Sequence, residues 1–307
     1  MAETPAVASL AIPASAADEA TLSQTPLSRA LRLLWRDRAA RVALTCLAVL
    51  VAAAIAAPWL APHDPALPLD PTAFKAIAPS RAHWLGTDLT SRDVLSRMLF
   101  GARISLAVAA LSASLASLLG LVYGGIAGYA GGRVDGVMMR IVDASLAIPR
   151  VLLLITVLAL WGAVDARALV LLLALTGWFG VARLARAEAA ALRERDFVVA
   201  ARALGAGPLR IFVRHVIPHA LGPVLVATTI AIGQVIVLEA GLSYLGYGVP
   251  QPTPTWGNII RDGRESIATT WWLTVFPGLA LVVTALAANT VADRLRAVLN
   301  PRQLHAP

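Results

Sequence analysis

The chain has 307 residues, of which 58% are hydrophobic and only 14% are charged. A soluble domain carries about 25% charged residues, so this chain would expose too much apolar surface to water, and the lipid bilayer must be much of its solvent. These values exclude most soluble enzyme folds. The formal charge of +8 is typical of membrane proteins whose cytoplasmic loops collect Lys and Arg. Few aromatic residues are interleaved with the arginines, so we expect no nucleic-acid partner.

The N-terminal segment, residues 1–28, is rich in Ala, Pro, Ser and Thr. It lacks the basic start and apolar core of a secretory signal, and we expect a disordered cytoplasmic tail. Five arginines follow it and predict the cytoplasmic flank of the first membrane span: Arg29, Arg32, Arg36, Arg38 and Arg41.

The first apolar segment, residues 42–60, is uncharged and long enough to cross a bilayer once. Pro58, Pro62 and Pro65 end this helix, and a polar loop with charges of both signs follows over residues 62–100. Residues 29–103 are therefore expected to hold the first transmembrane helix and an extracytoplasmic loop.

Five more apolar segments follow the loop. They are residues 104–132, 138–164, 168–182, 220–245 and 267–292. The sequence therefore predicts an all-α membrane protein with about six transmembrane helices. Residues 104–302 form its core, and residues 303–307 form a short tail.

A ridge of small residues runs along the second span at every fourth position. It consists of Ser112, Ala116, Gly120, Gly124 and Gly128. Small residues let helix backbones approach closely in lipid, where van der Waals packing replaces the hydrophobic drive. The ridge predicts close packing against another helix, although chance is an alternative in a chain so rich in alanine.

The orientation follows from where the basic residues gather. With six spans and the N-terminus inside, the inside segments hold the five N-terminal arginines, Arg133, the arginines from 183 to 214, and Arg294, Arg296 and Arg302. This bias predicts that both termini are cytoplasmic. Trp59, Trp161, Trp271 and Trp272 would then lie near the outer interface, where indole rings favour the headgroup level.

A basic, soluble-looking stretch, residues 195–223, interrupts the apolar spans on the cytoplasmic side. Asp196 is expected to start a short helix by accepting hydrogen bonds from its free N–H groups. Gly205 and Gly207 end that helix, and Pro208 begins a second amphipathic piece, which Pro218 stops. The stretch predicts either a partner-binding unit or an amphipathic helix on the lipid surface.

The same stretch resembles the cytoplasmic loop signature of binding-protein-dependent ABC importer permeases. Val199, Ala200 and Ala201 stand at the signature's E-A-A, and Gly205 stands at its glycine. His215 stands at its Ile, and Ile217 and Pro218 at its Leu-Pro. Val199 and His215 depart from the pattern.

The resemblance implies a coupling loop over residues 186–218 that docks into the ATPase subunit through its 196–218 part. The residues that it implicates in coupling are Asp196, Ala200, Ala201, Arg202, Gly205 and Pro218.

Three further stretches are similar to the C-type subunit of the dipeptide, oligopeptide and nickel permease group. They are residues 83–106, 127–149 and 239–260. The resemblance implies the type I importer permease fold, a homologous second permease, two ATPase subunits that bind ATP and Mg, and an extracytoplasmic binding protein. It implies a bacterial inner membrane, where the chain would form half of the translocation pathway. Short peptides are the implied cargo, with nickel complexes or glutathione-like solutes as alternatives.

Charges in or near the spans are further candidates. Asp143 and Arg150 are seven residues apart and would share one face of a helix, where they could line the pathway, or lie near the inner interface. Glu239, near the outer end of the fifth span, could gate the pathway or bond to a neighbouring loop. Asp88, Arg92 and Asp93 form an outer charge cluster that could dock the binding protein or make only local salt bridges.

We find no phosphate-binding loop, because Gly205 and Gly207 are not followed by Gly-Lys-Ser/Thr, and no nucleophile spaced with a base. The chain is therefore expected to be a non-catalytic subunit without a cofactor of its own. His215 and His219 have the spacing of helical metal ligands, but Pro218 lies between them, so no metal site is expected. An ion-coupled secondary transporter, with Asp143, Arg150 and Glu239 as its charges, is the less favoured alternative.

Overall fold

The computed structural model describes residues 35–70, 74–162 and 164–299. The predicted tails 1–28 and 303–307 lie outside these residues. Four helical segments are long and apolar enough to cross a membrane: α3 (Arg38–Ile55), α5 (Val94–Ala130), the run Pro208–Leu245, and α14 (Trp272–Leu299). Two bent pairs raise the number to six if each pair is one span. Within the described residues every named element is a helix, so the predicted all-α membrane fold is confirmed.

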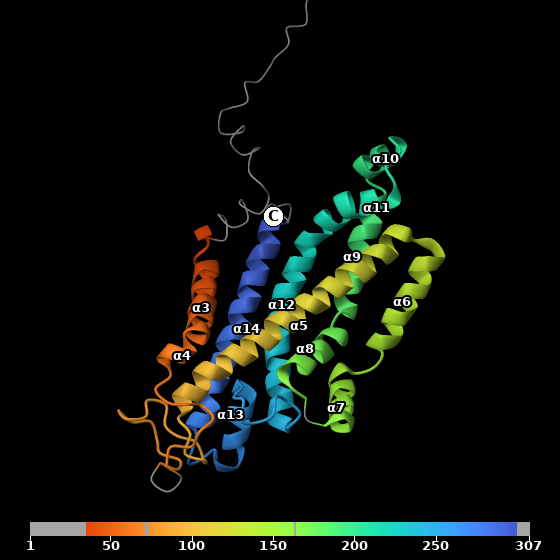
Figure 1. Ribbon diagram of the computed structural model, residues 1–307. Coiled ribbons are helices and arrows are strands. Elements are labelled where there is room, and N and C mark those ends of the chain that lie inside the picture. Colours follow the sequence, from red (N-terminus) through yellow and green to blue (C-terminus); the bar gives the residue numbers. More distant parts are fainter. Residues whose placement is uncertain (1–34, 71–73, 163, 300–307) are drawn as a thin grey trace, which may run out of the picture.

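Helix α5 crosses the middle of the bundle diagonally, with α3 and α14 on one side and α6 (Gly132–Leu146) on the other (Figure 1). At one end the short helices α10 (Asp196–Ala203) and α11 (Pro208–Ile211) project beyond the rest. We call this the tip end. It also carries the start of α3 and the end of α14 (Figure 1).

The opposite end, here called the loop end, carries the segment after α4 (Ala57–Leu60), α13 (Trp256–Gly263) and a short 3₁₀ helix (Arg264–Ser266) (Figure 1). The polar loop is shorter than predicted, because α5 already begins at Val94. The Asp93 carboxylate accepts the Ser96 N–H and starts the helix there. Trp272 is a second correction. It is buried and donates from Nε1 to the Thr87 carbonyl at 3.0 Å, so it does not lie at a lipid interface.

The small-residue ridge packs as predicted. All five of its residues are buried, and its glycines face α9 (Phe179–Arg193). A Cβ at Gly124 would overlap the Ala182 carbonyl oxygen, and one at Gly120 would lie 2.7 Å from Val181 Cβ. Since no side chain separates the two backbones at these points, the ridge sets how closely α5 and α9 approach.

The third predicted span is broken. Helix α6 ends at Leu146, and α7 (Arg150–Trp161) leaves it at 75°. Pro149 stands at the start of α7, and its ring and missing N–H prevent a continuous helix. Asp143 and Arg150 therefore do not share one helix face, and that prediction is wrong.

The fourth predicted span is bent as well. Helix α8 (Ala166–Leu175) and α9 meet at 45°. The Arg150 guanidinium reaches this second break, where it donates to the Leu173 carbonyl at 2.8 Å. Arg150 therefore links the breaks of two neighbouring spans.

Candidate functional site

The tip, residues 196–211, is a helix–turn–helix unit that projects from the bundle (Figure 1). Helix α10 begins at Asp196 as predicted, but Arg195 holds the N-cap position and no side chain caps the helix. The Asp196 carboxylate instead lies in the first turn, where the helix dipole favours a negative charge. Arg202 lies in the last turn, where a positive charge is favoured.

Gly205 ends α10 in the left-handed region, with φ +81°. The Ala206 N–H bonds to the Ala201 carbonyl and the Gly205 N–H to the Arg202 carbonyl, both at 3.0 Å. These two bonds form a Schellman motif, which requires a residue that tolerates positive φ. The predicted glycine stop is confirmed, and it fixes the direction in which the chain turns toward Pro208.

An apolar cluster holds the tip on the bundle. We call it the base cluster, and its buried members are Ala189, Val198, Ile211, Phe212 and Val216. It joins α9, α10, α11 and the short helical segment Phe212–Val216 that follows α11, and Tyr129 of α5 packs against it. Gly125 of α5 leaves room for the Phe212 ring, which a Cβ there would approach to 3.1 Å. The tip is therefore seated on the bundle, which means that it packs against α5, α9 and the start of the span that follows it.

Pro218 does not stop the second piece, contrary to the prediction. Residues Phe212–Val216 form a π-helix, and α12 (Ile217–Leu245) continues directly from it. The Ile217 N–H bonds to the Phe212 carbonyl five residues back. This wider turn accommodates the ring and the missing N–H of Pro218, so the tip continues into a membrane span without a hinge.

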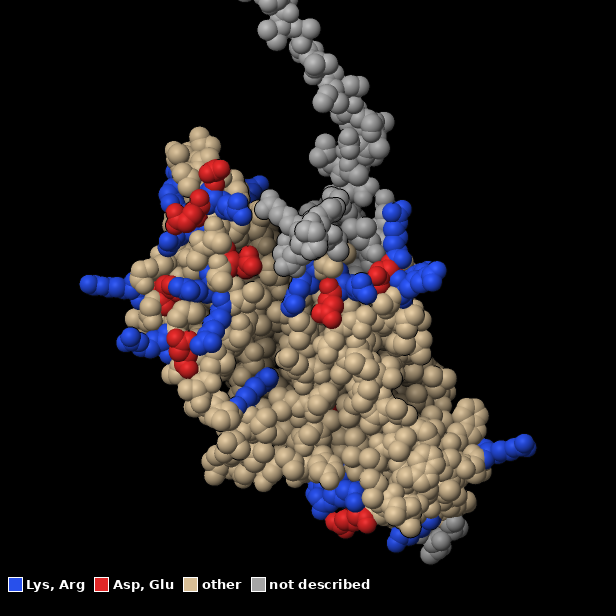
Figure 2. All heavy atoms as spheres, turned by 180° about the vertical axis from the view of Figure 1, so that it is seen from behind, with Lys and Arg blue, Asp and Glu red and all other residues tan. Residues whose placement is uncertain are grey.

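Apolar side chains stand exposed on this seated tip. Leu204 is 88% exposed and Leu209 73%. Ala200 is exposed nearby, whereas Ala201 is half-buried toward the base cluster. In Figure 2 most of the charged side chains gather toward the tip end, and a broad, largely uncharged belt lies below them. The tip thus carries its apolar patch outside the belt that would face lipid.

Two ion pairs fasten α6 to α9 near the tip end. Arg186 contacts Asp135 and Arg183 contacts Asp143, each at 2.5 Å. The second pair is exposed on both sides, which agrees with the alternative that Asp143 lies near an interface. A role of Asp143 or Arg150 in the pathway stays a prediction.

The loop end holds a largely buried charge network, which we call the loop-end network. It consists of Asp88, Arg92, Arg97 and Asp262. Asp88 Oδ2 contacts Arg92 Nε at 2.7 Å and Arg97 Nη1 at 2.5 Å. Asp262 Oδ2 contacts the two arginines at 3.1 and 2.9 Å. The network therefore ties the segment before α5 to α13.

Charge pairing decides the protonation of Asp88. Burial by itself would raise the pKa of its carboxyl, but the positive charges of Arg97 and Arg92 and the backbone N–H of Arg92 outweigh it and hold the pKa below its usual range. Asp88, Arg92 and Asp93 are all buried, and the contact between Asp88 and Arg92 matches the predicted alternative of a local salt bridge. Docking of a binding protein by these residues stays a prediction, and they could act only through the shape of the loop.

Glu239 joins three helices. It is fully buried and accepts hydrogen bonds from Ser243 of α12 at 2.7 Å and from Ser105 of α5 at 3.2 Å. Ser105 Oγ accepts in turn from the Trp256 N–H at the start of α13. These contacts match the predicted alternative of a structural bond to a neighbouring segment. A gating role for Glu239 stays a prediction.

Sequence reasoning missed Arg97, Asp262 and Ser105 as partners in these networks. Arg97 follows Asp93 by four residues, a helical spacing that would suggest Asp93 as its partner, but its guanidinium pairs with Asp88 and Asp262 instead. Asp262 lies more than 160 residues away, and nothing in its local pattern indicates Arg97 as its partner.

The comparisons with known proteins agree with this architecture. Residues 120–305 match the family described as "Binding-protein-dependent transport system inner membrane component". Residues 25–79 match the "N-terminal TM domain of oligopeptide transport permease C".

Curated relatives cover nearly the whole chain. A Brucella abortus protein whose name describes a peptide transport system permease is 39% identical over 92% of this chain and 94% of its own length. The dipeptide transport system permease DppC of Bacillus subtilis is 34% identical over 88% of this chain and 84% of its own. The oligopeptide permease OppC of the same organism is 34% identical over 94% and 95%.

A family match over more than half of the chain, together with relatives of this identity and coverage, settles the classification. The chain is a multi-pass membrane protein without catalytic chemistry of its own, and it belongs to the family of inner membrane permease components of binding-protein-dependent ABC transporters.

Proposed function

We propose that this permease imports short peptides together with a homologous second permease, two ATPase subunits and an extracytoplasmic binding protein. The names of its curated relatives, which describe peptide, dipeptide and oligopeptide permeases, support the cargo class. ATP and Mg would be held by the ATPase subunits. The chain itself would form half of the pathway between the two permeases.

The observation that carries the coupling part of the proposal is the exposed apolar patch on a seated tip. Leu204 and Leu209 would stand in water beyond the membrane belt, and exposed apolar patches of this kind mark protein contacts. The base cluster, which includes Val198 and Phe212, would transmit a displacement of the tip to α5, α9 and α12. The tip is therefore the proposed ATPase contact.

The proposal also fixes an orientation. If the tip meets a cytoplasmic ATPase, the start of α3 and the end of α14 are cytoplasmic too, because they lie at the same end (Figure 1). The loop end then faces the binding protein. There, a cleft of about 710 Å³ is lined in part by Arg261, Asp262, Arg264 and Glu265. This charged cleft is the proposed place where cargo passes from the binding protein.

An ion-coupled transporter has less support. Asp143 is paired with Arg183, Arg150 bonds to a backbone carbonyl, and Glu239 bonds to two serines. Each of the three candidate charges is thus committed to a structural contact.

Purification in mild detergent from the native host tests the proposal. The tagged permease is expected to bring down two ATPase subunits and a second permease. Leu204→Glu should lose most of the ATPase, because a carboxylate replaces the apolar centre of the contact. Leu67→Glu, which changes an exposed leucine at the loop end, should retain it. A wild-type chain that comes down alone would overturn the proposal.

Gly205 should be needed for coupling rather than for folding. Gly205→Glu places a side chain at φ +81°, where an L-residue costs about 1–2 kcal/mol. Apart from its chain neighbours, no atom of the described residues lies within 4 Å of the added Cβ. We expect a folded permease with lost peptide uptake and no cargo-stimulated ATP hydrolysis. Gly207→Ala is the matched control, with equally free space and negative φ. Normal uptake and ATPase association in Gly205→Glu would contradict the coupling role.

A further inference from the structure

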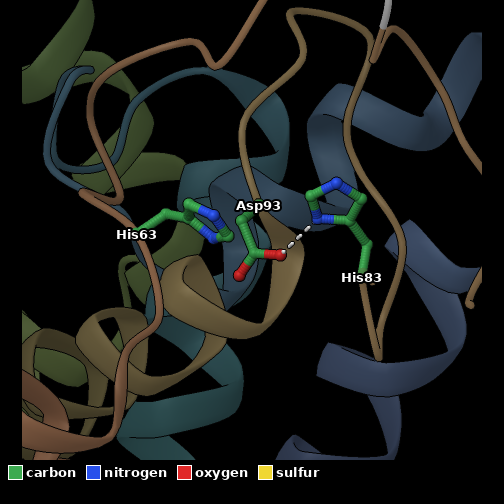
Figure 3. Close-up of side chains that lie close together, drawn as sticks. All are labelled: His63, His83 and Asp93. Atoms are coloured by element: carbon green, nitrogen blue, oxygen red, sulfur yellow. Dashed lines mark hydrogen bonds and ion pairs between the residues drawn. The ribbon is translucent and has the colours of Figure 1, made fainter. Parts of the chain in front are cut away.

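Three metal-ligating side chains meet at the loop end, and one of them is Asp93, the residue that caps α5. His63 follows α4, His83 lies in the loop, and Asp93 precedes α5. One ligand atom from each lies within 4.8 Å of the other two. Figure 3 shows the Asp93 carboxylate between the two imidazole rings, whose centroids are 5.7 Å apart.

The carboxylate is held in place from its far side. Asp93 Oδ2 accepts hydrogen bonds from the N–H and the hydroxyl of Ser96, both at 2.8 Å. The His63 backbone N–H donates to the same hydroxyl at 3.1 Å. This arrangement resembles an outer shell of a metal site, in which hydrogen bonds orient the ligands. Asp93 Oδ1 is left to face the histidines.

The Nδ1 atoms of His63 and His83 have fewer hydrogen bonds than the Asp93 carboxylate. His63 Nδ1 is buried and has no hydrogen-bond partner among the described residues. His83 Nδ1 lies 3.3 Å from Asp93 Oδ1, a long contact for a hydrogen bond. Two ligands of a tetrahedral zinc ion with bonds of about 2.0–2.1 Å lie about 3.3–3.4 Å apart, so this pair already has the spacing of ligands. A ring nitrogen of the half-buried His63 lies within 4.8 Å of both and would have to move closer to become the third ligand.

We propose that His63, His83 and Asp93 bind one divalent transition-metal ion of the zinc class. Two imidazoles and one carboxylate are borderline ligands suited to Zn²⁺, and a water molecule would take the fourth position. The ion would fasten the beginning of the loop between α4 and α5, at His63, and a later part of it, at His83, to Asp93 directly before α5. It would give a buried nitrogen its partner and neutralise the Asp93 charge.

Zinc binding to the full-length chain tests the site without a transport assay. The chain is purified in detergent through a tag without histidines, stripped with chelator, and titrated with ZnCl₂ by calorimetry. We expect one zinc ion per chain, an upward shift of the melting temperature, and an X-ray absorption spectrum with two imidazole ligands.

His63→Gln is the main variant, because His63 is half-buried and its replacement should fold. Loss of one ligand should weaken binding at least about 100-fold, since even outer-shell partners account for about 10–100-fold. His83→Gln should do the same. His219→Gln is the matched control: it lies on α12 near the tip end and is exposed, so zinc binding should not change.

No zinc binding by the wild-type chain would overturn the proposal. So would binding that survives His63→Gln, or binding that His219→Gln abolishes to the same extent, because the ion would then lie elsewhere.

Discussion

Asp88→Asn is expected to destabilise the loop end by about 3 kcal/mol, the lower end of the range for removing one partner of a buried ion pair. Arg97 is 1% exposed and would lose its closest counter-charge. It keeps Asp262 at 2.9 Å, and for this reason we expect the lower value. The measurement is the melting temperature of the purified permease in detergent at neutral pH.

For the same variant we expect the loss of stability to depend on pH. The pKa of Asp88 is lowered in the folded chain, so its contribution to stability is complete above the unfolded value of about 3.9 and is lost as the pH falls through the folded pKa. The stability difference between wild type and Asp88→Asn should therefore be constant from neutral pH to about pH 4 and shrink below it.

The control for Asp88 is Glu265→Gln. Glu265 forms an exposed pair with Arg264 at 3.0 Å, and its side chain is 80% exposed. Exposed pairs contribute about 0–1 kcal/mol, so little change is expected. If Asp88→Asn had the same melting temperature as this control, the loop-end network would not stabilise the loop end.

Gly124→Ala should disrupt the contact between α5 and α9. The new Cβ would overlap the Ala182 carbonyl oxygen and lie 2.7 Å from the carbonyl carbon. A backbone cannot yield as a side chain does, so the helices must separate. Overpacking costs about 1–3 kcal/mol, and we expect the upper end here. The measurements are the yield of monodisperse protein and its melting temperature.

Gly180→Ala is the matched control for this packing. Gly180 also lies in the α5–α9 pair, on α9, but it is exposed. In the described part of the chain, nothing outside its own helix turn lies within 4 Å of an added Cβ. Alanine is the better helix former by about 1 kcal/mol, so this change should be neutral or stabilising. Gly128→Ala should repeat the Gly124 effect, because its Cβ would overlap the Arg186 carbonyl oxygen. Equal melting temperatures of Gly124→Ala, Gly128→Ala and Gly180→Ala would contradict the close approach of α5 and α9.

The sequence by itself determined the features that depend on short-range pattern. Apolar length marks a membrane span because the bilayer has a fixed thickness. The small-residue ridge fixed a packing face on α5, since helical spacing places its members in one row. Gly205 marked the end of α10 because only glycine adopts positive φ without strain. Motif spacing further identified the family.

Only the tertiary structure decided which distant groups meet. Pro149 and Pro218 look alike as helix breakers, yet one breaks a span by 75° and the other is absorbed by a π-turn. Burial likewise made Asp88 and Glu239 parts of structural contacts. The arginines that pair with Asp88 also hold Asp262, and Glu239 bonds to Ser105, so both contacts reach helices far away in the sequence. Burial and charge pairing arise from the whole fold, and no local pattern encodes them.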